Sequence, residues 1–117
     1  GRAVRLAPNE SLILGGYGRA LLAVGQNAKA RDTLERARAR DPLDGRILRD
    51  LGTAYAKTGN NGMASLSIAE RYALRGRLKD AAIHANRAVG LLPRGSAPWQ
   101  RANDVLAAAK TPEKGKR

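Results

Sequence analysis

The sequence repeats at an interval of 34 residues, and half that interval is present as well. Residues 34 apart include Gly25 and Gly59, Leu21 and Tyr55, Ala30 and Ala64, and Pro8 and Pro42. Tyr55 and Tyr72 are 17 apart, as are Gly59 and Gly76. A period in this range is typical of stacked helical hairpins, none of which can bury its apolar face alone. The repeat therefore predicts a stack of helices and favours a binding module.

Six helices follow from their start and stop signals. They are predicted over residues 10–24, 28–40, 45–58, 62–75, 78–91 and 97–109. The predicted N-caps are Asn9, Asn27, Asp44, Asn60 or Asn61, and Ser96. Apolar residues inside these segments recur at spacings of three and four, and none alternate as in a strand. An all-α domain over residues 1–109 is predicted, with hairpins at about 10–40, 45–75 and 78–109.

Both ends of the chain carry a separate expectation. Ala3 and Pro8 have the same five-residue spacing as Ala37 and Pro42, so residues 1–8 are interpreted as the end of a truncated preceding repeat. The chain is accordingly expected to be a fragment of a longer protein. Residues 110–117 are polar and charged, which predicts a flexible tail.

Composition narrows the possibilities further. The 117 residues include no Cys, which excludes disulfides and thiolate metal sites. No stretch is long and apolar enough to cross a bilayer. The net charge of +12 favours acidic partners, although an Arg-rich bias of the whole proteome would also produce it. The basic residues are scattered along the chain rather than gathered in one stripe, which favours the compositional bias over a dedicated acidic partner.

The repeat positions resemble the tetratricopeptide repeat, whose pattern is W-x2-L-G-x2-Y followed by A-x3-F, A and P. Segment 45–59 carries Leu48, Leu51, Gly52, Tyr55 and Gly59 in phase. Segment 11–44 carries Leu14, Tyr17, Gly18, Leu21, Gly25, Ala30, Leu34, Ala37 and Pro42. Segment 62–95 carries Ala69, Tyr72, Gly76, Ala81, Ala85, Ala88 and Pro93. The resemblance implies an α-solenoid of about three hairpins with a C-terminal capping helix, acting as a protein-binding scaffold.

Particular residue types have a physical reason in this pattern. Gly18, Gly52 and Ala69 would let two helices approach closely, and Ala30 and Ala81 would receive the partner helix. Trp99 is expected to cover the exposed end of the stack, as terminal repeats require. A hot spot for a partner is the alternative role of Trp99.

A narrower resemblance covers residues 62–106. The segments A-E-R-Y-x-L-x-G, H-A-x-R-A, L-P-x-G-S-x-x-W and R-A-x-D are similar to the C-terminal repeats of bacterial periplasmic Ste24-like zinc metalloproteases that enhance β-barrel assembly. Pilus-assembly lipoproteins built from the same repeats are a second similar group. Either resemblance implies the bacterial periplasm or a membrane-associated assembly rather than the cytoplasm. No H-E-x-x-H occurs, so no zinc or catalytic residue is carried over, although a metallopeptidase domain would precede such a region in the parent protein.

The sequence contains no pattern of a catalytic, metal-binding or phosphate-binding site. His84 is the only histidine and is interpreted as a solvated surface residue, because a metal site needs at least three ligands. Gly15-Gly16-Tyr17-Gly18 follows no strand and lacks the G-K-S/T of a phosphate loop. We therefore expect a non-enzymatic chain with no cofactor and no small-molecule substrate.

Nucleic-acid binding is the less favoured alternative. The helix at 28–40 is strongly basic, but binding to single strands also needs exposed aromatic side chains. The four aromatic residues are instead expected to pack between helices: Tyr17, Tyr55, Tyr72 and Trp99.

The candidate site is the surface that the first helices of the hairpins would present. Counting from Leu14 and Leu48, the positions between packing residues are Leu12, Arg19, Arg46, Arg49, Thr53 and Lys57. Such a groove would be basic and would hold an acidic or carboxylate-bearing peptide through charge-assisted hydrogen bonds. The Lys/Asn clamp of chaperone-binding repeats is not reproduced, since Gly15, Arg19 and Asp50 stand in its place. A merely solvated groove is the alternative.

Overall fold

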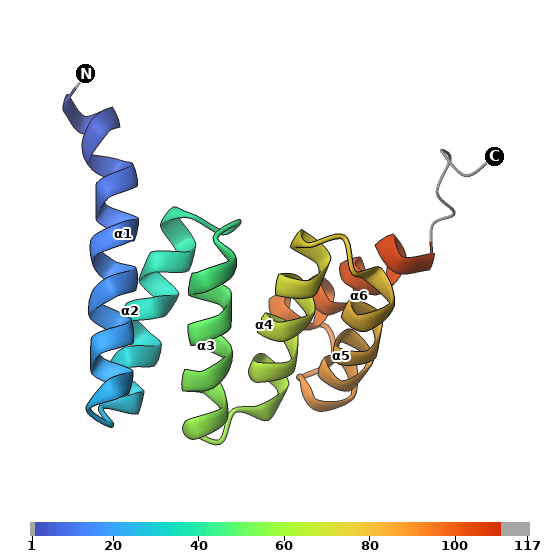
Figure 1. The fold of residues 1–117 in the computed structure, drawn as a ribbon. Coiled ribbons are helices and arrows are strands. Elements are labelled where there is room, and N and C mark those ends of the chain that lie inside the picture. Colours follow the sequence, from blue (N-terminus) through green and yellow to red (C-terminus); the bar gives the residue numbers. More distant parts are fainter. Residues whose placement is uncertain (1, 111–117) are drawn as a thin grey trace. The chain divides into compact units, whose positions relative to one another are not determined.

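The structure, a computed structural model, describes residues 2–110, with side chains described from Glu10 onward. It contains six helices: α1 (Arg2–Ala23), α2 (Asn27–Arg40), α3 (Gly45–Lys57), α4 (Asn61–Leu74), α5 (Leu78–Leu91) and α6 (Ala97–Lys110) (Figure 1). No strand occurs between residues 2 and 110, and the all-α prediction is confirmed. None of the described helices has the length and apolar composition needed to span a membrane.

Contacts between residues divide the chain into two compact units. The first unit is residues 1–60 and contains α1, α2 and α3, while the second is residues 61–117 and contains α4, α5 and α6. In each unit, two helices form an antiparallel pair and a third helix packs against that pair (Figure 1). The hairpin predicted at 45–75 crosses the boundary between the units and stays a prediction.

Most helix ends lie where local signals placed them. The predicted range 78–91 is that of α5, and Asp44 and Ser96 cap α3 and α6 as expected. Gly59 follows the end of α3 with φ of 78°, a left-handed conformation that glycine adopts without steric strain. These ends are predictable because caps and glycines act through the nearest turn of backbone.

Two predicted helix starts are wrong. Helix α1 begins at Arg2 rather than after Asn9, so residues 2–8 continue into the same helix. Pro8 lacks an amide hydrogen and removes one hydrogen bond, but the remaining bonds of a 22-residue helix persist on both sides of it. Asn27 does not cap α2, because it is already helical and its Oδ1 is buried without a hydrogen-bond partner. At the other end, Lys110 belongs to α6, and the rest of the predicted tail lies outside the described residues.

The first unit is centred on a close approach of α1 to α2. Gly18 faces Leu34, which is completely buried, and a Cβ at position 18 would lie 2.5 Å from Leu34 Cγ. Helix α3 packs against this pair, and the Tyr55 hydroxyl donates a hydrogen bond of 2.5 Å to Glu35 Oε2 on α2. Glycine at position 18 is therefore a packing requirement, as the repeat pattern predicted. Tyr17, in contrast, is exposed, and its predicted packing role is wrong.

The second unit has two small apolar clusters. Leu66, Ala88, Leu92 and Ala102 form one cluster, with Trp99 packed against it. Ala69, Ala81, Ala85 and Val105 form the other, beside Tyr72. Arg101 on α6 donates hydrogen bonds of 2.6 and 3.0 Å to the two carboxylate oxygens of Glu70 on α4. Trp99 thus covers one of the clusters, which fits its predicted covering role.

Candidate functional site

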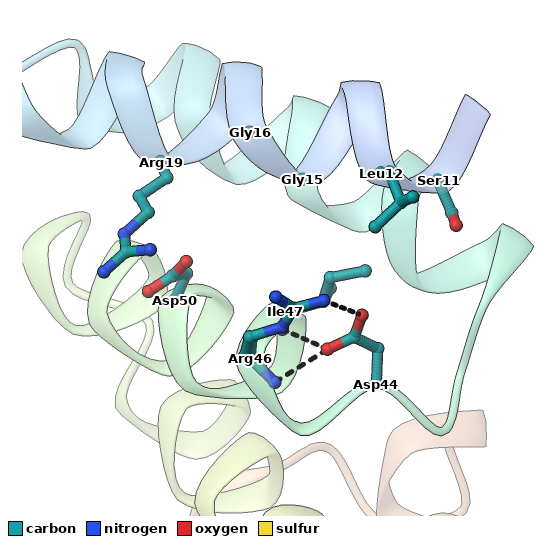
Figure 2. Close-up of a pocket in the computed structure, with 9 residues that line it drawn as sticks. All are labelled: Ser11, Leu12, Gly15, Gly16, Arg19, Asp44, Arg46, Ile47 and Asp50. Carbon is teal, nitrogen blue, oxygen red and sulfur yellow. Dashed lines mark hydrogen bonds and ion pairs between the residues drawn. The ribbon is translucent and has the colours of Figure 1, made fainter. Parts of the chain in front are cut away.

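A pocket of about 140 Å³ opens between α1 and α3 of the first unit (Figure 2). Its lining residues are Ser11, Leu12, Gly15, Gly16, Arg19, Asp44, Arg46, Ile47 and Asp50. Three of the predicted site residues, Leu12, Arg19 and Arg46, line it. The pocket therefore brings together side chains from two helices, α1 and α3. The sequence related these side chains only by their equivalent positions in the repeat.

The helix positions explain why a hollow exists there. Gly15 and Gly16 contribute no side chain to the wall on α1. Ile47 on α3 is buried and approaches this bare stretch, since a Cβ on Gly15 would be 3.4 Å from Ile47 Cγ1. Leu12 and Ile47 supply apolar surface, and Arg19 and Arg46 supply charge (Figure 2). Concave apolar surface with a few oriented polar groups is typical of a binding site.

Asp44 fixes the α3 side of the pocket. One of its carboxylate oxygens accepts hydrogen bonds from the amides of Arg46, at 2.8 Å, and Ile47, at 3.3 Å. Partial burial by itself raises the pKa of Asp44, but these amides and the Arg46 guanidinium outweigh it, and the net pKa is lowered. Asp44 is therefore ionised at neutral pH and orients the first turn of α3.

Asp44→Ala is expected to lower the free energy of unfolding by about 1 kcal/mol, because two amides lose their acceptor. The folded-state pKa lies below the unfolded one, so the charge stabilises the fold at neutral pH and loses this effect as pH falls below about 4. Urea denaturation at pH 7 and pH 3 measures both effects. Asp44→Asn, which retains a capping oxygen, is expected to stay near the parent at pH 7 and to lack the acid-dependent loss. Equal stability of Asp44→Ala and the parent at pH 7 would contradict the capping role.

The carboxylates of Asp44 and Asp50 reduce the positive charge of the site. Arg46 forms an ion pair with Asp44 at 3.5 Å, and Arg49 forms one with Asp50 at 3.3 Å. The Arg19 side chain points toward Asp50 across the pocket (Figure 2). Asp44 was predicted only as a helix cap, and Asp50 only as a residue standing in place of the missing Lys/Asn clamp, without an ion pair to either arginine. The adjacency of Asp50 to Arg49 was a usable signal for this pairing.

The remaining predicted residues, Arg49, Thr53 and Lys57, do not line the pocket. They lie on α3 at spacings of three and four from Arg46, which places the four residues along one face of the helix. The Thr53 hydroxyl donates to the Arg49 carbonyl at 3.3 Å, so it satisfies the helix backbone. Membership of these three residues in the binding surface stays a prediction.

His84 differs from its predicted environment. It is half-buried on α5 and stacks on Tyr72, with ring centroids 5.5 Å apart, while Arg77 lies 5.3 Å from the centre of the Tyr72 ring. Burial lowers the pKa of His84, as does Arg87, and Asp80 partly opposes them. Within the described part of the chain, no group of three or more potential metal-ligating side chains comes together. His84 is thus a packing residue of the second unit.

The fold defines a class, that of helical-repeat proteins built from short antiparallel pairs. Residues 17–62, from within α1 to the start of α4, match the family model for the tetratricopeptide repeat. Together with the all-helical structure, this match supports a tetratricopeptide-repeat protein. A search of the curated proteins found no match, and neither did a search of the solved structures. Repeats of this family generally mediate contacts between proteins and are typically not catalytic.

Proposed function

We propose that the first unit binds a peptide segment of a partner protein, with the pocket between α1 and α3 as the anchor point and no catalysis. The observation that carries this proposal is the pairing of exposed guanidinium groups, Arg19 and Arg46, with apolar surface from Leu12 and Ile47 in one hollow. A peptide that places a carboxylate against the guanidinium groups and an apolar side chain against the floor uses both features.

The charge pattern favours an acidic peptide. Arg19, Arg46, Arg49 and Lys57 provide four cationic groups, against the two carboxylates of Asp44 and Asp50, so the surface keeps a positive excess. The two carboxylates repel a peptide whose acidic groups are out of register, which adds selectivity. Arg49, Thr53 and Lys57 extend the proposed surface along α3, where a longer peptide would continue.

The test is fluorescence polarisation with a fluorescein-labelled peptide of alternating Glu and Leu. Arg19→Glu combined with Arg46→Glu is expected to weaken binding about tenfold or more, since two attractive contacts become repulsive. Lys29→Glu combined with Arg36→Glu makes the same change in net charge on exposed residues of α2 and is expected to have little effect. A control peptide with Lys in place of every Glu is expected not to bind. An equal loss of affinity in both double variants would show that binding depends on net charge alone, and would refute the pocket as the binding site.

The resemblance of residues 62–106 to the repeats of two groups of bacterial proteins supports a more specific proposal about the parent protein and its compartment. We infer a partner-binding region in the bacterial periplasm or in a membrane-associated assembly, belonging to a zinc metalloprotease of outer-membrane quality control or to a pilus-assembly lipoprotein. The gene sequence on the N-terminal side of Gly1 tests this inference. An H-E-x-x-H helix selects the protease, a lipoprotein signal selects the pilus group, and a cytoplasmic protein without either contradicts both.

Nucleic acid is the weaker alternative partner. Of the four aromatic residues, Tyr17 is exposed, Tyr55 is buried, and Tyr72 and Trp99 are half-buried. One exposed aromatic ring provides little surface for stacking successive bases. Single-stranded DNA added to the peptide assay should compete only at low salt, where its binding depends on net charge.

A further inference from the structure

Arg19 differs from the other two arginines of the proposed binding surface, Arg46 and Arg49. Arg46 is paired with Asp44 at 3.5 Å, and Arg49 is paired with Asp50 at 3.3 Å. Arg19 is exposed and forms no ion pair or hydrogen bond with any residue whose side chain the structure describes. Its guanidinium therefore lines the pocket in a state that is free to bind a carboxylate of a ligand.

The two carboxylates of the pocket differ in how far their oxygens are already used. Both oxygens of Asp44 have partners, since Oδ1 accepts from the amides of Arg46 and Ile47 and Oδ2 accepts from the Arg46 guanidinium. Asp50 accepts one hydrogen bond, from Arg49 Nε to Oδ1 at 3.3 Å, and its Oδ2 has no partner among the described residues. The Asp50 side chain is 15% exposed, so a ligand can reach it. Asp50 therefore keeps an acceptor available for a donor of the ligand.

Arg19 and Asp50 face one another from the two walls of the pocket, on α1 and α3 (Figure 2). Within the described part of the chain, their charged groups form no ion pair with each other. Two opposite charges that face each other without contact can each pair with a separate charge of a ligand that lies between them. A carboxylate would pair with Arg19, and an ammonium or guanidinium group would pair with Asp50. A second carboxylate in the same place would instead be repelled by Asp50.

We propose that Asp50 determines the specificity of the pocket: among peptides with an acidic residue for Arg19, it selects those that carry a basic residue beside the acidic one. This inference rests on the proposed peptide-binding function. In an extended peptide, side chains two residues apart lie on the same face, about 7 Å from one another, so the pattern Glu-x-Lys presents both charges to the pocket together. The preferred partner segment is therefore of mixed charge rather than uniformly acidic.

Asp50 contributes little to holding the fold together. Its hydrogen bond joins it to the adjacent Arg49, whose side chain is 40% exposed, and an exposed ion pair of this kind adds little stability. Asp44, in contrast, caps the first turn of α3. The nearly isosteric change Asp50→Asn is therefore expected to leave the midpoint of urea denaturation unchanged. Changes in binding by this variant then report on the pocket and not on unfolding.

Fluorescence polarisation with two fluorescein-labelled peptides tests the selection. The first is the peptide of alternating Glu and Leu, and in the second every other Glu is replaced by Lys. Asp50→Asn is expected to strengthen binding of the first peptide about threefold, because a repulsion is lost, and to weaken binding of the second about threefold, because a pairing is lost. Asp32→Asn is the matched control. Asp32 on α2 is paired with the adjacent Arg31 at 3.2 Å, in the same way as Asp50 with Arg49, but does not line the pocket.

Opposite changes for the two peptides in Asp50→Asn would support a direct contact, because the Glu and Lys charges of the second peptide cancel and its binding responds little to net charge. An unchanged affinity of Asp50→Asn for the second peptide, or an equal loss in Asp32→Asn, would overturn the selection and leave the pocket as a binding site. The proposed function fails in a different way: the parent binds neither peptide, or Arg19→Glu combined with Arg46→Glu leaves both affinities unchanged.

Discussion

Gly18→Leu is expected to lower the free energy of unfolding by about 3 kcal/mol or more. A Cβ at position 18 would lie 2.5 Å from Leu34 Cγ and 2.6 Å from Leu34 Cδ2. Leu34 is completely buried, so its side chain has no free space to move into, and α1 and α2 must separate. Urea denaturation followed by circular dichroism measures the loss.

Two further variants make this prediction specific. Gly90→Ala serves as the control, because a Cβ there meets no atom within 4 Å and the better helix propensity of Ala should stabilise by about 0.5–1 kcal/mol. Leu34→Ala alone should cost about 2–5 kcal/mol, yet combined with Gly18→Leu it should cost less than the sum of the two changes, since the cavity of one accommodates the other. Additive costs would show that the two residues do not share a contact.

Trp99→Ala is expected to lower the free energy of unfolding by about 3 kcal/mol. Its indole packs against the cluster of Leu66, Ala88, Leu92 and Ala102 and joins α6 to α4 and α5. The same denaturation experiment distinguishes its two proposed roles. A residue that serves only as a hot spot for a partner would leave the free chain as stable as the parent.

Ile83→Ala is the matched control for Trp99→Ala. Ile83 lies in the same unit and is an exposed apolar residue of α5, so its truncation should change the stability by less than about 0.5 kcal/mol. Similar losses in the free energy of unfolding for both variants would show that burial of the side chain does not determine the loss. That result would contradict the covering role of Trp99.

The helices themselves were largely predictable from local sequence. The Asp44 cap, the glycines after α1, α3 and α4, and Pro93 after α5 act on the backbone within a turn of their own position. The start of α1 was not predictable in this way. A proline is compatible both with a helix boundary and with the interior of a long helix that loses one hydrogen bond, and local sequence does not choose between them.

The candidate site was only partly predictable. Repeat phase indicated Leu12, Arg19 and Arg46, because phase determines which face of a helix a residue occupies. It did not reveal that Asp50 on α3 lies across the pocket from Arg19 on α1, since that depends on which helices become neighbours (Figure 2). It also misplaced Tyr17, whose 34-residue counterpart Leu51 is buried.

The sequence alone determined the period, the helical class and the close approach at Gly18, because each arises from residue types at fixed spacings. Only the tertiary structure decided which faces are covered. Burial depends on whether another helix lies opposite a given face, and two equivalent positions of a repeat, such as Ile13 and Ile47, can carry the same side chain while one is exposed and the other is buried.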